Sequence, residues 1–124
     1  MRRILLAGLV MAAACAGSGA RGMPTRDPDV ITAVELATQA GVTARQAIER
    51  LRPRFLRVRG PSTINAPDAD RIVVYVDNSR MGGVEVLNQI RADDITEIRY
   101  MSAPDATSRY GTGHSAGAIV IMRK

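Results

Sequence analysis

The 124-residue sequence has few of the side chains on which disulfides, metal sites and aromatic stacking depend. It contains one cysteine, one histidine, one phenylalanine, three tyrosines and no tryptophan. A single cysteine cannot form an intramolecular disulfide, and a lone histidine cannot define a zinc site by spacing. The shortage of aromatic residues argues against a nucleic-acid binder, which stacks bases on aromatic rings, and it requires an aliphatic core.

The sequence also lacks an apolar run long enough to cross a bilayer. The best candidate, Ile4–Ala14, has about 11 residues, whereas a transmembrane helix needs about 20. This run follows Arg2 and Arg3 and ends in small residues, which is the build of a secretory signal. The flanking residues of a twin-arginine motif are missing, so we predict ordinary secretion with residues 1–14 as the signal peptide.

Cys15, at the end of this signal, is a candidate site of lipid attachment. The residues Ala12–Cys15 resemble the lipobox of bacterial lipoproteins, in which small residues precede a cysteine that is acylated, with palmitate for example, and becomes the mature N-terminus. The resemblance implies lipidation of Cys15 and, because Ala16 follows, sorting to the outer membrane with the domain facing the periplasm. Cleavage after Ala14 without lipidation is the alternative, since the site also has the A-x-A form. We predict that residues 15–30 form a flexible tether.

The charge of the mature chain is modest and unevenly spaced. Without Arg2 and Arg3 there are 15 basic and 12 acidic side chains, a net charge of +3. Arginines are densest at positions 50, 52, 54, 57 and 59. Such a run suits anionic lipid headgroups or an acidic partner, although it is more often a solvated face.

Three short helices are predicted in the body of the chain, residues 31–124. Two of them open with a capping box, a threonine followed three residues later by Glu or Gln, and carry an apolar stripe at helical spacing. The third opens at a serine cap and ends at a glycine. The predicted helices are Thr32–Ala40, Thr43–Leu51 and Ser102–Gly111.

Four strands are predicted from alternating or unbroken apolar residues. They are Phe55–Arg59, Ile72–Val76, Thr96–Met101 and Ala118–Met122. Asp77-Asn78 offers the turn of a hairpin, and a polar loop runs from Gly60 to Asp70. Strands interleaved with short helices predict an α+β fold, in which one small mixed sheet has short helices packed on it.

Two stretches of the body resemble the plug domain of TonB-dependent receptors. The first is Arg57–Gly60 followed by IVVYVDNSRMGG at Ile72–Gly83, similar to the plug's R-G segment and hydrophobic strand with a V-D-G turn. The second, Ala92–Ile121, is similar to the closing signature D-I-E-x-I-E-V-L-x-G-P-x-A-x-x-Y-G-x-x-x-x-x-G-V-I-x-I. The resemblance covers residues 31–124. The positions that carry it are Arg59, Gly60, Asp77, Asp94, Tyr110, Gly111 and Gly117.

The resemblance implies a plug-like fold in which these positions are structural. Asp77-Asn78 replaces the family's Asp-Gly turn, and Ala103-Pro104 replaces its Gly-Pro; neither change threatens the fold. The receptors continue into a membrane β-barrel where this sequence stops at Lys124. No convincing TonB box is found either, so we expect the fold and the outer-membrane location of the family but not its transport activity.

No combination of side chains predicts catalysis. Ser102, Ser108 and Ser115 have no base and orienting acid at a recognisable spacing. His114 is expected to be a surface or loop residue whose replacement by alanine changes stability little. Valine at Gly111 or Gly117, by contrast, is expected to cost a few kcal/mol.

The paired carboxylates Asp93 and Asp94 are expected to be structural caps rather than a cation site. We therefore expect no enzymatic activity, no cofactor and no metal.

The expected function is that of an outer-membrane-associated periplasmic lipoprotein. Its plug-like domain would be a non-catalytic interaction module that binds an envelope β-barrel or another periplasmic protein. The alternative is a small-ligand carrier that holds a nutrient between the loops Gly60–Asp70 and Asn78–Val84. A module predicts an exposed apolar patch, whereas a carrier predicts a concave site between those loops. Nucleic acid is not an expected partner.

Overall fold

The computed structural model describes residues 26–58 and 71–124 and confirms the predicted α+β fold. The described strands form one mixed five-stranded sheet in the order β1-β4-β5-β2-β3, in which β2 and β5 are parallel and the other neighbours antiparallel. Cys15, Arg59 and the whole predicted polar loop Gly60–Asp70 lie outside the described residues. The strands are β1 Val30–Thr32, β2 Val73–Val76, β3 Ser79–Gly82, β4 Ile95–Met101 and β5 Ala118–Arg123.

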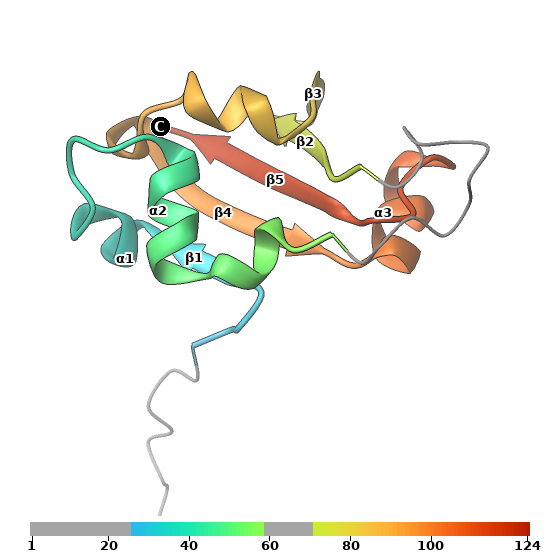
Figure 1. Cartoon of the computed structure of the whole chain (residues 1–124), viewed down its shortest axis with the longest axis horizontal. Coiled ribbons are helices and arrows are strands. Elements are labelled where there is room, and N and C mark those ends of the chain that lie inside the picture. Colours follow the sequence, from blue (N-terminus) through green and yellow to red (C-terminus); the bar gives the residue numbers. More distant parts are fainter. Residues whose placement is uncertain (1–25, 59–70) are drawn as a thin grey trace, which may run out of the picture.

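Short helices cover the two faces of this sheet unequally. Figure 1 shows α1 and α2 together on one side, and α3 at the end where β4 finishes and β5 begins. Both predicted capping boxes are present, at Thr32 with Glu35 and at Thr43 with Gln46. The helices are α1 Ala33–Ala37, α2 Ala44–Leu51 and α3 Ala103–Tyr110, with 3-10 turns η1 Pro53–Leu56, η2 Val84–Asn88 and η3 Ala92–Asp94.

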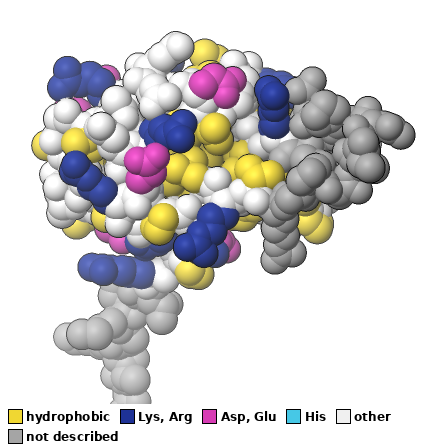
Figure 2. Space-filling model, in the orientation of Figure 1, with side chains coloured by type: hydrophobic (Ala, Val, Ile, Leu, Met, Phe, Trp, Pro, Cys, Tyr) yellow, Lys and Arg dark blue, Asp and Glu magenta, His cyan; other side chains and the backbone are white. Residues whose placement is uncertain are grey.

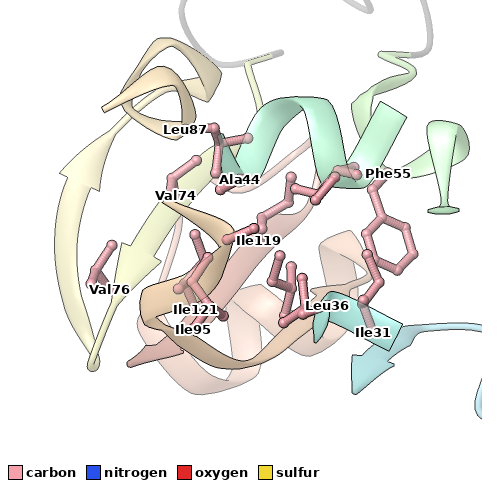
Figure 3. Close-up of a cluster of buried hydrophobic side chains, with 14 of the residues drawn as sticks. Ile31, Leu36, Ala44, Phe55, Val74, Val76, Leu87, Ile95, Ile119 and Ile121 are labelled. Atoms are coloured by element: carbon pink, nitrogen blue, oxygen red, sulfur yellow. The ribbon is translucent and has the colours of Figure 1, made fainter. Parts of the chain in front are cut away.

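The main core lies between the sheet and the α1 and α2 layer. Alternate residues of β5 point to opposite faces, so Ile119 and Ile121 enter this core while Ala118 and Val120 pack under α3. Figure 3 shows strand side chains meeting those of the helices, with Phe55 at one end of an otherwise aliphatic cluster. The core is therefore aliphatic, as the composition predicts.

The predicted strand Phe55–Arg59 is wrong. Pro53 starts the 3-10 turn η1, and Arg57 and Val58 belong to no strand. Proline is favoured in the first turn of a helix, where its missing N–H is not needed. Phe55 is fully buried and stacks on Tyr100 with 5.4 Å between ring centroids. Burial of one aromatic ring, rather than strand pairing, therefore fixes this segment.

The predicted hairpin is confirmed. Asp77 and Asn78 have positive φ angles of 48° and 67° and connect β2 to the antiparallel edge strand β3. The opposite edge strand, β1, is absent from the sequence prediction because three residues are too few to show alternation. The predicted helix Thr32–Ala40 is correspondingly shorter, since its first residue ends β1 and α1 ends at Ala37.

A partly buried ion pair ties α1 to the end of α2. Arg52 Nη2 donates to Glu35 Oε1 at 2.9 Å, and the two side chains are 18% and 11% exposed. Burial raises the pKa of Glu35. Hydrogen bonds from the Thr32 backbone and from Arg52, together with the charge of Arg52, lower it by more than burial raises it. The pKa of Glu35 is therefore held below its ordinary 4.5. The ionised pair therefore stabilises the folded chain.

This pair predicts a pH-dependent loss of stability. Because the folded pKa of Glu35 is lowered, its contribution is complete above the unfolded pKa of 4.5 and disappears as pH falls through the folded pKa. Glu35→Gln should lower the free energy of unfolding by about 1 kcal/mol at pH 7 and by progressively less below pH 4.5. Urea unfolding from pH 7 to pH 3 measures this difference.

Glu49→Gln is the matched control, because Glu49 pairs with Arg45 on the exposed surface of α2. This substitution should change stability by less than about 0.5 kcal/mol. A Glu35→Gln penalty that stays constant between pH 7 and pH 3 would contradict the assignment.

Candidate functional site

The site with the most chemical variety lies on the second face of the sheet, beside α3. Ser102 caps this helix by accepting a hydrogen bond from the Asp105 N–H, and Gly111 terminates it with a φ angle of 92°. The helix covers one end of the sheet through Ala106, which is fully buried, and Tyr110. Both ends of α3 are therefore set by local sequence.

An open pocket of about 470 Å³ lies between the segment before β1, the end of β4 and α3. This volume falls within the range of small-molecule sites. The pocket combines apolar side chains with two guanidinium groups and three carboxylates. Its lining residues are Asp27, Asp29, Val30, Arg99, Tyr100, Met101, Asp105, Ser108 and Arg109.

Most of these charges already have partners within the chain. Asp29 pairs with Arg54 Nη2 at 2.7 Å, and Arg99 pairs with Glu97 at 3.1 Å. Arg109 donates to Asn78 Oδ1 at 3.1 Å. A ligand here would therefore replace exposed ion pairs, which are individually weak, and a small molecule carrying both charges would fit best.

An aromatic cluster lies beside this pocket, under α3. Tyr75 of β2 and Tyr110 of α3 stack with 3.8 Å between ring centroids and 10° between ring planes. His114 lies 5.8 Å and 6.0 Å from their centroids and is only 2% exposed. Three of the few rings in the chain thus fasten α3 and the loop that follows it to the sheet.

Hydrogen bonds fix the orientation of the His114 ring. Nδ1 lies 2.8 Å from the Gly111 carbonyl oxygen, and Nε2 lies 2.7 Å from the Tyr75 hydroxyl. A carbonyl only accepts, so Nδ1 carries a proton; in the neutral ring, Nε2 then accepts from Tyr75. Both ring nitrogens are occupied, and neither is directed at a serine.

The expectation that His114 lies on the surface is wrong, although it does lie in a loop. The buried ring makes two hydrogen bonds and two ring contacts in place of contacts with water. The sequence contains no local signal for this burial, because the main partner, Tyr75, is 39 residues away. Spacing around His114 could have suggested only the short-range bond to Gly111.

The described motif positions surround this helix and the hairpin. Tyr110 and Gly111 end α3, and Gly117 precedes β5 with its N–H donating to the His114 carbonyl at 2.9 Å.

Asp77, in the hairpin turn, accepts from the Arg123 backbone N–H at 2.9 Å and from Arg123 Nε at 3.0 Å. Both bonds lower the pKa of Asp77, and the bond from the Arg123 backbone has the larger effect.

The expected capping by Asp93 and Asp94 is not found. Both residues lie in η3, which has no side-chain cap. Asp93 instead accepts from the Gly41 N–H at 3.2 and 3.3 Å, joining η3 to the turn between α1 and α2. The Asp94 side chain is exposed, and its backbone carbonyl accepts from the Lys124 N–H at 3.0 Å. A long-range turn contact has replaced the local cap.

Within the described residues, no three His, Cys, Asp or Glu side chains form a group that could hold a metal ion. The helices of residues 26–58 and 71–124 include none with the length and apolarity needed to span a bilayer. The arrangement beside α3 can therefore be described as a charged pocket next to a closed aromatic cluster.

Comparison with known proteins identifies a similar fold. No protein-family model and no curated protein matches the sequence. Among solved structures, the ferric enterobactin receptor PfeA from Pseudomonas aeruginosa, as a Q482A mutant in complex with enterobactin, is similar with a TM-score of 0.51 and 21% identity. The similarity covers 80% of this chain but only 18% of the receptor chain. This chain therefore has an α+β fold similar to that of one part of the ferric enterobactin receptor.

Proposed function

We propose that this chain is an outer-membrane-associated lipoprotein whose plug-like domain is a non-catalytic interaction module facing the periplasm. Two separate observations support the plug-like assignment: the sequence signatures at Ile72–Gly83 and Ala92–Ile121, and the fold similarity to part of a ferric enterobactin receptor. The secretory signal and the lipobox-like residues before Cys15 support the location.

The docking role is supported mainly by one observation: α3 covers only part of the second sheet face. The helix α3 packs over Val73, Tyr75, Ala118 and Val120. Further along the same face, a row of paired strand residues runs across β1, β4 and β5. Met122, in this row, is 41% exposed. This open row consists of Thr32, Glu97 and Met122.

An apolar side chain surrounded by polar and charged ones is the usual make-up of a non-obligate protein interface. The open row therefore offers a partner one apolar contact with a polar rim. The row is much smaller than the exposed apolar patch expected of an interaction module, so it suits a contact that is partly polar.

Docking predicts site-specific crosslinking in cells. A photo-reactive phenylalanine derivative at position 122 should form a discrete adduct with another envelope protein. The same residue at Glu49, which lies on α2 over the opposite sheet face, should not. Immunoblotting detects the adducts, and equal adducts from both positions would contradict a directed interface.

The second candidate function is that of a small-ligand carrier, which the pocket beside α3 favours. Its position differs from the sequence expectation, because residues 79–82 form the edge strand β3 rather than a loop and do not line the pocket. The other expected loop, Gly60–Asp70, lies entirely outside the described residues. Mass spectrometry of gently purified protein, showing a small molecule that is lost in Arg109→Ala, would favour the carrier over the module.

A further inference from the structure

The segment from the end of α2 through η1 is the most basic part of the described chain. Between Arg50 and Val58 there are four arginines and no acidic residue. Guanidinium groups suit phosphate because their planar N–H groups can donate two parallel hydrogen bonds. The four guanidinium groups differ in whether another group of the fold already binds them.

Only one of the four is withdrawn from the surface. Arg52 forms the partly buried pair with Glu35 that joins α1 to α2. Arg54 pairs with Asp29 on an exposed surface, and Arg50 donates to the neutral amide of Gln39 at 3.2 Å. Arg57 is exposed and, like Arg50, forms no ion pair with a carboxylate of the described residues. Three arginines therefore remain accessible.

Among these arginines, Arg54 lies where the segment before β1 meets the domain. Arg54 donates to both the Pro28 carbonyl oxygen and Asp29, so η1 lies directly against that segment. Arg26 is exposed, and its charge is close enough to Glu35 to lower the pKa of that carboxyl. Its effect on this pKa is smaller than the effects of the Thr32 backbone hydrogen bond and of Arg52. Figure 2 shows basic side chains near the lower edge of the described part of the chain. We call Arg26, Arg50, Arg54 and Arg57 the basic surface.

The proposed tether would bring this surface to a membrane. A random coil of about 11 residues, the separation of Cys15 and Arg26 in the sequence, has a root-mean-square length of about 18 Å. Tethering over so short a distance gives an effective concentration near the millimolar range, so a weak surface affinity is sufficient. Each arginine close to an anionic bilayer strengthens binding about fivefold, within the Debye length of about 8 Å at physiological salt.

We propose that the basic surface binds the anionic headgroups of a phospholipid bilayer and thereby orients the domain, with the sheet face that carries Met122 directed away from the lipid. This inference rests on the envelope location proposed above. The two faces are opposite, because η1 and α2 pack on the main core while Met122 alternates with the core residue Ile121 on β5. One side of the domain would thus meet lipid and the other a protein partner.

Vesicle co-sedimentation tests the proposal with the mature-length chain carrying Cys15→Ala, which removes any contribution from the lipid anchor. The chain should bind vesicles of phosphatidylethanolamine and phosphatidylglycerol at 3:1 in 50 mM salt. It should not bind phosphatidylcholine vesicles, and 500 mM salt should release it. The double variant Arg50→Gln/Arg57→Gln should bind at least tenfold more weakly.

Arg80→Gln/Lys124→Gln is the matched control, since it removes the same charge from exposed positions on β3 and after β5. It should bind within about twofold of the starting chain, and circular dichroism should show that both double variants are folded. Equal weakening by the two variants, or equal binding to phosphatidylcholine, would overturn the proposal. Release by 10 mM inorganic phosphate at constant ionic strength would do so too, because it would indicate a discrete phosphate site.

The vesicle result and the docking result are independent. Vesicle binding involves no partner protein, and crosslinking from position 122 does not require the basic surface. Vesicle binding without a crosslink would remove the docking role and leave the lipid-binding surface. A crosslink without vesicle binding would do the reverse.

Discussion

Gly117→Ala is expected to lower the free energy of unfolding by about 3 kcal/mol or more. Gly117 has a φ angle of 85°, where side chains are disfavoured. A β-carbon there would lie 2.5 Å from the Met101 carbonyl oxygen and 2.8 Å from the Tyr100 hydroxyl. The Met101 oxygen is backbone in the sheet, so relief requires β4 and β5 to move apart. Urea unfolding followed by circular dichroism measures the loss.

Gly111→Ala separates backbone strain from this collision. Gly111 has a similar φ angle of 92°, but its β-carbon would meet nothing within 4 Å. We expect a loss of about 1–2 kcal/mol from strain alone. The sequence alone predicts similar losses at the two glycines, whereas the structure predicts a clear difference. Equal losses for the two variants would contradict the close approach at Gly117.

His114→Ala is expected to cost about 2–3 kcal/mol, in contrast to the small effect expected from the sequence. The substitution removes a buried ring and leaves both the Gly111 carbonyl and the Tyr75 hydroxyl without their partner. Tyr75→Phe should cost about 1 kcal/mol, because it removes only the hydrogen bond to Nε2. Denaturant unfolding of the two single variants and the double variant measures the coupling between these residues.

Thr112→Ala controls for general sensitivity of this loop, because Thr112 is exposed. This substitution should change stability by less than about 0.5 kcal/mol. A His114→Ala loss as small as that of Thr112→Ala would mean that the ring is not buried in solution. A purely additive double variant of His114 and Tyr75 would contradict the hydrogen bond between them.

The parts of the fold that sequence predicts well depend on neighbouring residues. The capping boxes of α1 and α2 and the serine cap of α3 each need contacts only three residues apart, so the pattern identifies them. The hairpin turn at Asp77-Asn78 is also local, because these residue types tolerate positive φ. Local signals thus predict element type and turn position.

The errors concern residues whose surroundings come from distant segments. Phe55 alternates like a strand residue but is held by Tyr100, and Asp93 has the spacing of a cap but binds Gly41. His114 depends on Tyr75, which no spacing rule connects to it. The pocket beside α3 likewise combines the segment before β1 with β4 and α3, so its lining could not be predicted.

The interaction module is tested most directly by crosslinking from position 122 in living cells, with the adduct identified by mass spectrometry. We predict one predominant adduct containing an envelope protein, absent when the photo-reactive residue is at Glu49 and reduced in a Cys15→Ala background that lacks the proposed anchor. No adduct from position 122, together with a small molecule bound in the pocket of the purified protein, would contradict the module and favour the carrier.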